Sequence, residues 1–234
     1  MRGGTGNDTY VVGADVSGIY GGTALEYGDI GTGGGLANSE ADAVNFNSVN
    51  SVSDLIFERK AVRNEADGNS LSITDSGGNE TILFDNYNTY LDFRRVEYLT
   101  VEDGANNDEV YEIVTSASKN IADWDNEIYV ADGGTTDIKL GGHDYIVGSS
   151  KADTFNFSLG DIVGSADAEG TIDLLQLGSG DAITFTDPGS DLTTAEGTSL
   201  NNLLQASVAS GGQIKFDFDY DYDYTYAFLA IYCF

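Results

Sequence analysis

The chain has very few of the residues that stiffen a backbone, cross-link it or carry positive charge. Its 234 residues include one proline, one cysteine, one histidine and ten lysines and arginines. Because Cys233 is the single cysteine, no disulfide can form within the chain. Because His143 is the single histidine, zinc sites built from several histidines are excluded. No apolar run approaches the roughly 18 residues of a membrane-spanning helix, so none is expected.

Positive charge is the largest deficit. Thirty-nine acidic residues against ten basic ones give a formal net charge of −29. Such a charge repels nucleic acid and anionic membranes, so we expect neither as a partner, and cations are the expected partners instead. A hydrophobic content of 41% with 11% aromatic residues is too high for a disordered chain, so the protein is expected to fold.

Thirty glycines indicate many tight turns between short strands. In the first half of the chain, alternating apolar and β-branched residues predict several such strands. The predicted strands are 44–49, 54–58, 71–74, 81–84, 97–101 and 109–114.

Beyond residue 128, large apolar residues recur every eight or nine positions. They are Tyr129, Ile138, Ile146, Phe155, Val163 and Ile172. A unit this short holds only one turn and one strand, so its apolar side chains must be buried by the next unit. The repeat predicts an all-β fold built on a parallel β-roll or β-solenoid, with two units per coil and coils about 4.8 Å apart.

The chain is therefore divided into three predicted regions. Residues 1–127 are strand-rich and irregular, 128–190 form the β-roll, and 191–234 form a C-terminal cap. Thr193 and Glu196 are spaced as a capping box before leucines at helical spacing, which predicts a short helix near 194–209.

The cap ends in FDFDYDYDYTYAF, residues 216–228, which alternates aromatic and acidic residues. Read as one long strand, it places its aromatic rings on one face and Asp217, Asp219, Asp221 and Asp223 on the other. We expect the aromatic face to close the end of the roll. The acidic face is expected to meet solvent and loosely held cations, which also protects the strand from edge-to-edge pairing.

The N-terminal segment GGTGNDTYV, residues 3–11, fits the nonapeptide GGxGxDxUx at every specified position, U being a large apolar residue. Glycines allow a turn tight enough to point backbone carbonyls inward, and the aspartate adds a carboxylate. Together they make the oxygen shell that Ca²⁺ prefers. Gly4, Gly6 and Asp8 are therefore candidate calcium-site residues.

Weaker copies of this frame follow along the chain. In residues 103–110, Asp108 occupies the acid position and Asn106 replaces a glycine, and asparagine is the best substitute at positive φ. Three degenerate or shortened copies supply the other candidate calcium ligands, which are Asp137, Asp144 and Asp153. For each aspartate the alternative is an ordinary turn that needs no metal.

These motifs resemble the RTX (repeats-in-toxin) group of calcium-binding β-roll proteins. The segment RRVEYLTVEDGANNDEVYEI is similar to segments that flank such repeats, and the ending DYTYAFLAI is similar to the cap after RTX rolls. The resemblance implies a bacterial protein, extracellular or on the cell surface, exported by type I secretion through an uncleaved C-terminal signal. This fits an opening segment, MRGGTGNDTY, that lacks the apolar core of a cleaved signal.

The sequence thus predicts a non-enzymatic, calcium-binding structural module of a bacterial surface layer, filament, matrix or adhesin. Calcium ions, further copies of the chain and a cell-surface polysaccharide are the expected partners. The alternative is a calcium-binding accessory region of a secreted hydrolase, lyase or epimerase. Ice binding ranks last, because ladders of Thr and Asn occur only at Thr5 and Asn7. His143 is interpreted as a turn residue and Cys233 as an inert or intermolecular thiol.

Overall fold

The structure is a computed structural model, and all structural statements concern the residues that it describes. These are 9–12, 42–47, 49–61, 70–83, 86, 96–102, 108–114, 126–138, 143–158, 168–186, 202, 204–206, 213–221 and 226–233.

The chain forms two compact units, Met1–Ile113 and Val114–Phe234. The boundaries expected after residues 127 and 190 both fall inside the second unit. No unit boundary occurs near residue 190, because the C-terminal strand β14 (Ile214–Asp221) pairs with β12 (Ala168–Leu175) and so continues a sheet of the repeat region.

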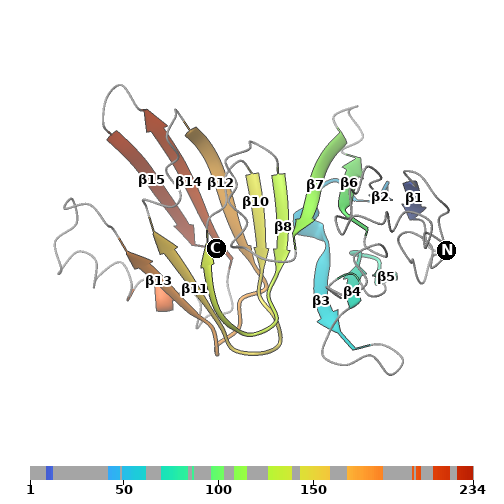
Figure 1. Ribbon diagram of the computed structural model, residues 1–234, viewed down its shortest axis with the longest axis horizontal. Helices are drawn as coiled ribbons and strands as arrows, with labels where there is room; N and C mark the ends of the chain where they lie inside the picture. The colour runs from blue at the N-terminus through green and yellow to red at the C-terminus, as the bar shows by residue number, and fades with distance from the viewer. Residues whose placement is uncertain are drawn as a thin grey trace, which may run out of the picture. The chain divides into compact units, whose positions relative to one another are not determined.

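The first unit contains four paired strands and a separate antiparallel sheet of three strands (Figure 1). In the four-stranded part the first three strands are parallel and the last is antiparallel to its neighbour. The strands are β1 (Thr9–Val12), β2 (Ala43–Phe46), β6 (Tyr98–Glu102) and β7 (Asp108–Val114). The smaller sheet, which follows the 3-10 turn η2 (Val52–Asp54), is formed by β3 (Ile56–Lys60), β4 (Ser70–Thr74) and β5 (Glu80–Leu83). The predicted strands of this half match within a few residues.

In the second unit, six successive strands alternate between two parallel sheets. They are β8 (Asn126–Val130), β9 (Gly134–Ile138), β10 (His143–Val147), β11 (Asp153–Ser158), β12 (Ala168–Leu175) and β13 (Ala182–Thr186). Strands β8, β10 and β12 pair side by side, while β9, β11 and β13 pair in the other sheet (Figure 1). The protein is therefore mostly β with parallel sheets, as predicted.

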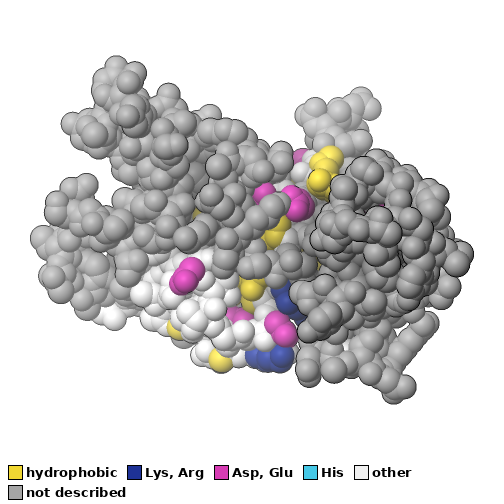
Figure 2. Space-filling model, viewed as in Figure 1, with side chains coloured by type: hydrophobic (Ala, Val, Ile, Leu, Met, Phe, Trp, Pro, Cys, Tyr) yellow, Lys and Arg dark blue, Asp and Glu magenta, His cyan; other side chains and the backbone are white. Residues whose placement is uncertain are grey.

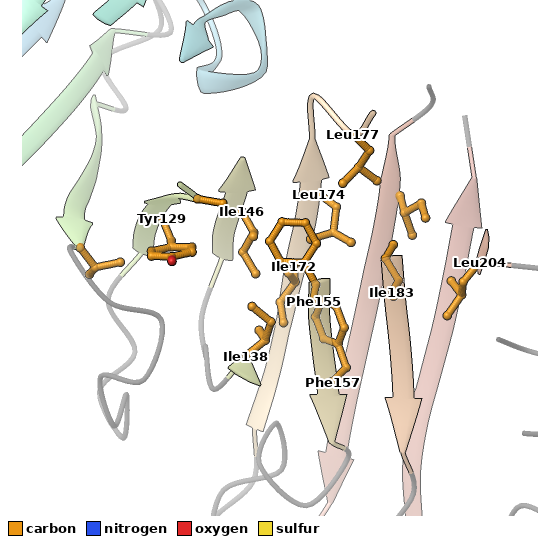
Figure 3. Close-up of a cluster of buried hydrophobic side chains, with 13 residues drawn as sticks. Tyr129, Ile138, Ile146, Phe155, Phe157, Ile172, Leu174, Leu177, Ile183 and Leu204 are labelled. Atoms are coloured by element: carbon orange, nitrogen blue, oxygen red, sulfur yellow. The ribbon is translucent and has the colours of Figure 1, made fainter. Parts of the chain in front are cut away.

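The eight-to-nine-residue repeat is confirmed as the periodicity of the core. Tyr129, Ile138, Ile146, Phe155 and Ile172 belong to one buried cluster, and Val163 lies outside the described residues. Figure 3 shows side chains of both sheets pointing toward one another in this cluster. The apolar repeat thus marks the positions at which the two sheets share a core.

The predicted register, two repeat units per coil, holds between Tyr129 and Ile146 but not between Ile138 and Phe155, because Ile138 pairs with Phe157. Ile146 pairs with Tyr129, two repeat units earlier. On its other side the repeat places Val163, two units later, but Ile146 pairs with Leu174 in β12. The repeat also places Ile172 beside Phe155, whereas Ile172 stands in β12 next to β10. The connection between β11 and β12, residues 159–167, is longer than the connections between the preceding strands, so the third pair of strands begins later than the repeat predicts.

The C-terminal part differs from the prediction of one long strand. β14 ends at Asp221, and the chain returns antiparallel as β15 (Tyr226–Cys233). The single strand over 216–228 is therefore wrong. A second strand pairs the N–H and C=O groups on the outer side of β14, which a lone capping strand would leave without partners.

The predicted helix over 194–209 is described only in part. Residues 202 and 204–206 are helical, whereas Thr193 and Glu196 lie outside the described residues. Leu204 belongs to the buried cluster, and Gln205 Nε2 donates to the carbonyl of Ile183 at 2.7 Å. No helix in the described part of the chain is long and apolar enough to cross a membrane.

A close approach between two turns makes Gly148 a sensitive position. A Cβ on this residue would lie 2.8 Å from the carbonyl oxygen of Gln176 and 3.2 Å from Asp181 Oδ2. We predict that Gly148→Ala lowers the free energy of unfolding by about 1–3 kcal/mol, because a backbone atom must move. The matched control is Gly180→Ala, whose Cβ meets no atom closer than 3.7 Å. Urea denaturation measures both, and equal midpoints for the two variants would contradict the prediction.

Candidate functional site

Two aspartates hold the turns on one side of the parallel sheets. Asp153, the first residue of β11, accepts hydrogen bonds at Oδ1 from the Gly133 N–H at 2.7 Å and at Oδ2 from the Ser149 N–H at 2.7 Å. The Ser149 hydroxyl donates to the same Oδ2 at 2.9 Å. One carboxylate thus joins its own turn to the turn before it.

Asp181 repeats this arrangement one strand further along the sheet. Its Oδ1 accepts from the N–H of Asp153 at 3.0 Å, and its Oδ2 accepts from the N–H of Gly178 at 2.7 Å. Both aspartates are buried. Hydrogen bonds from N–H groups to carboxylates are among the stronger ones in proteins, so these two acids are stabilised without a metal ion.

On the other side of the sheets a different arrangement appears. Asp144 in β10 and Glu127 in β8 are both 0% exposed. Asp144 Oδ1 accepts from the Glu127 N–H at 3.1 Å, while its Oδ2 has no hydrogen-bond partner among the described residues. By the two-residue period of a strand, these acids share the face of Ile146 and Tyr129, which point into the core. We call these two residues the buried acid pair.

Burial makes ionisation of the pair unfavourable. Burial chiefly, followed by the interaction with the Glu127 side chain and its charge, raises the pKa of the Asp144 carboxyl to about 10, while the hydrogen bond from the Glu127 N–H acts in the opposite direction. Two adjacent carboxyl groups out of water must either share protons or take up a cation. Among the described residues, the buried acid pair is therefore the position at which a bound cation would most increase the stability of the folded state.

The remaining predicted ligands have different surroundings. Asp137 is exposed within β9, where its Oδ1 accepts from Asn156 Nδ2 at 3.0 Å. Asp108 begins β7 opposite Glu102, so the segment before it connects two antiparallel neighbours in one sheet. Gly4, Gly6, Asp8 and Asn106 lie outside the described residues.

His143 is not in a turn, which corrects its prediction. It is the first residue of β10, and its Nε2 lies 3.1 Å from Asp173 Oδ2. Its ring centroid is 4.9 Å from that of Tyr145. Because His143 precedes Asp144 by one residue, its imidazole lies on the opposite face of β10 from the buried acid pair. There it contacts Asp173 and Tyr145.

Three acids of the predicted comb lie in β14. Asp217 is opposite Thr171 and Asp219 is opposite Glu169 in β12, and Asp223 lies outside the described residues. The pairing of Asp219 with Glu169 puts two like charges directly across the sheet, which is unfavourable unless solvent or cations screen them.

Sequence reasoning missed Glu127 and Asp181. Neither lies in a full glycine-rich frame, but each stands two residues before a buried apolar residue, as do Asp144 and Asp153. This spacing of an acid and an apolar residue on one strand face was the available signal. Asp137 lacks it, because it directly precedes Ile138 and so faces the other way.

No group of three or more His, Cys, Asp or Glu suited to a metal ion occurs among the described residues. In Figure 2 the described acidic side chains lie at several separate places on the visible face. Comparisons with protein-family models, curated proteins and solved structures found no significant match.

The role of Asp153 as a link between turns is testable without metal. We predict that Asp153→Ala, measured by urea denaturation in EDTA, costs about 2–3 kcal/mol of stability, because two backbone N–H groups lose their acceptor. Asp137→Ala is the control, since this exposed aspartate accepts a single side-chain hydrogen bond from the described residues and its replacement is expected to cost less than about 0.5 kcal/mol. Similar losses for the two variants would refute the role.

The buried acid pair predicts a specific pH dependence in EDTA. The folded pKa of Asp144 lies above its unfolded value of about 3.9, so the stability it provides is complete below about pH 4 and is lost as pH rises toward 10. We expect Asp144→Asn to weaken this decline and to be more stable than the wild type at pH 8. Asp132→Asn, at a surface ion pair with Lys151, should keep the decline. Parallel pH profiles for all three proteins would contradict the prediction.

Proposed function

We propose that the chain is an extracellular, calcium-binding β-roll protein that serves as a structural module of a bacterial surface assembly. The two parallel sheets are interpreted as the two sides of the roll, with each pair of successive strands as one coil. The observation that carries the proposal is the buried acid pair, because two carboxyl groups side by side out of water must share protons or take up a cation.

The residues present fit a calcium ion in their chemistry. Carboxylates and carbonyls are the ligands that Ca²⁺ prefers, and Asp144 Oδ2 is a buried oxygen with no hydrogen-bond partner in the described part of the chain. Asp144 and Glu127 would hold the ion. When bound, the ion supplies positive charge that removes the need for a shared proton.

Because the chain has a net charge of −29, neutralisation of its carboxylates by cations affects the stability of the whole fold. Self-repulsion disfavours the compact state, so a cation that binds only the folded chain stabilises it by mass action. Where free calcium is scarce the chain would stay loosely folded, and where calcium is abundant the roll would form. This coupling of metal to folding suits a protein that is exported before it folds.

The structure of the C-terminal end bears on how such a module would assemble. β12 is covered by β14, so a further parallel coil cannot add to β12. Stacking of further coils on β12 is therefore blocked, so contacts between copies must use other strands.

Calcium titration tests the proposal. We expect calcium at 100 times its dissociation constant to raise the free energy of unfolding by about 2.7 kcal/mol for each site that forms only in the folded state. In calorimetry, Glu127→Gln with Asp144→Asn should lose at least one calcium equivalent. The control pair Glu58→Gln with Asp132→Asn removes the same charge from exposed β3 and from the Lys151 ion pair, and should bind as the wild type does. Equal calcium binding by all three proteins would overturn the assignment.

A further inference from the structure

The last strand of the sheet in the second unit has an unusual edge. β15 pairs with β14, and no described strand pairs with its other side. Its eight residues, YAFLAIYC, carry no charge in a chain of net charge −29. An edge strand with neither charge nor proline offers a row of backbone N–H and C=O groups to another strand.

The other described edge strands differ in length or in charge. β9 carries Asp137, and β3 carries three charged residues. β5 begins with Glu80, while β1 and β13 have four and five residues. Charged residues and short lengths are the usual protections against edge pairing, and β15 has neither.

From this contrast we propose that β15 pairs antiparallel with β15 of a second copy of the chain, across a two-fold axis perpendicular to the sheet. Such an axis requires that residues opposite each other lie on the same face. A register centred on Leu229 meets this condition. It places Ala227 opposite the partner's Ile231 and Phe228 opposite the partner's Ala230, so a small residue meets a large one at these pairs, on either side of the central pair of Leu229 residues.

Charge favours a second copy over another partner. A charged strand of another protein would find no opposite charge along β15. The β15 strand of a second copy is itself uncharged and therefore buries no unpaired charge in the contact. The inference rests on the assembly part of the proposed function and not on its calcium site, because β15 contains no acidic residue.

Sedimentation velocity of the full chain, in EDTA and in calcium, tests the pairing. We expect a dimer whose dissociation constant rises at least tenfold in Ala230→Lys. Ala230 lies opposite Asp217 in β14, so a lysine there gains a favourable cross-strand partner within its own subunit. In the dimer, the two lysines are diagonal neighbours across the axis and repel each other. If Ala230→Lys fails to fold, Phe228→Lys, opposite Asp219, replaces it, because in this register the two lysines are again diagonal neighbours across the axis.

Two controls separate this effect from bulk and from net charge. Ala230→Thr adds volume without charge, and Asn202→Lys adds the same charge at an exposed helical residue. Both should dimerise as the wild type does. A wild type that is monomeric at all concentrations, or lysine variants that dimerise normally, would overturn the inference.

The direction of pairing has its own measurement, because Cys233 is the only cysteine and can carry a spin label. In the register centred on Leu229 the two Cys233 residues lie eight positions apart, about 27 Å at ~3.4 Å per residue. Dipolar spectroscopy should find this distance. Ready formation of a disulfide between the two Cys233 residues would indicate parallel pairing and contradict the proposal. Dimers in EDTA without any response to calcium would refute the calcium site alone.

Discussion

Hydrogen bonds from turn N–H groups to buried carboxylates are the interaction on which the second unit depends. Parallel neighbours cannot be joined by a tight hairpin, so each connection must leave one sheet and enter the other. The turns that do this leave backbone N–H groups without partners in a strand. Asp153 and Asp181 accept from these groups and link successive turns. In β9 the position paired with Asp153 is Gly134, which has no carboxylate, so the series of linking aspartates begins with β11.

The two sides of the parallel sheets use acids in opposite ways. On one side, backbone N–H donors surround the carboxylates of Asp153 and Asp181 and join them to successive turns. On the other side, Asp144 receives one backbone N–H and lies next to Glu127, so negative charge is disfavoured. Similar acids at similar distances from a core residue therefore give a fixed structural link in one place and a demand for a proton or a cation in the other.

Much of the fold could be predicted because it follows from local pattern. Period-two alternation located the strands of the first unit, and the eight-to-nine-residue repeat located Tyr129 through Ile172 in one core. The candidate site was less accessible to prediction. Asp137, Asp144 and Asp153 stood in similar shortened frames, yet one is exposed and two are buried in different surroundings. What separates them is the neighbouring strand, which the local sequence does not contain.

The sequence by itself determined the class of the protein: a highly acidic, glycine-rich β chain whose repeat length requires one strand per unit. It also predicted aspartates near glycine-rich turns as the candidate cation ligands, a set that leaves out Glu127. Only the tertiary structure decided that Asp144 meets Glu127, that Asp153 meets Gly133, and that the C-terminal segment turns back on itself to form β14 and β15. Those outcomes depend on register between strands, which is set by connection lengths and by the backbone hydrogen bonds that each edge must satisfy.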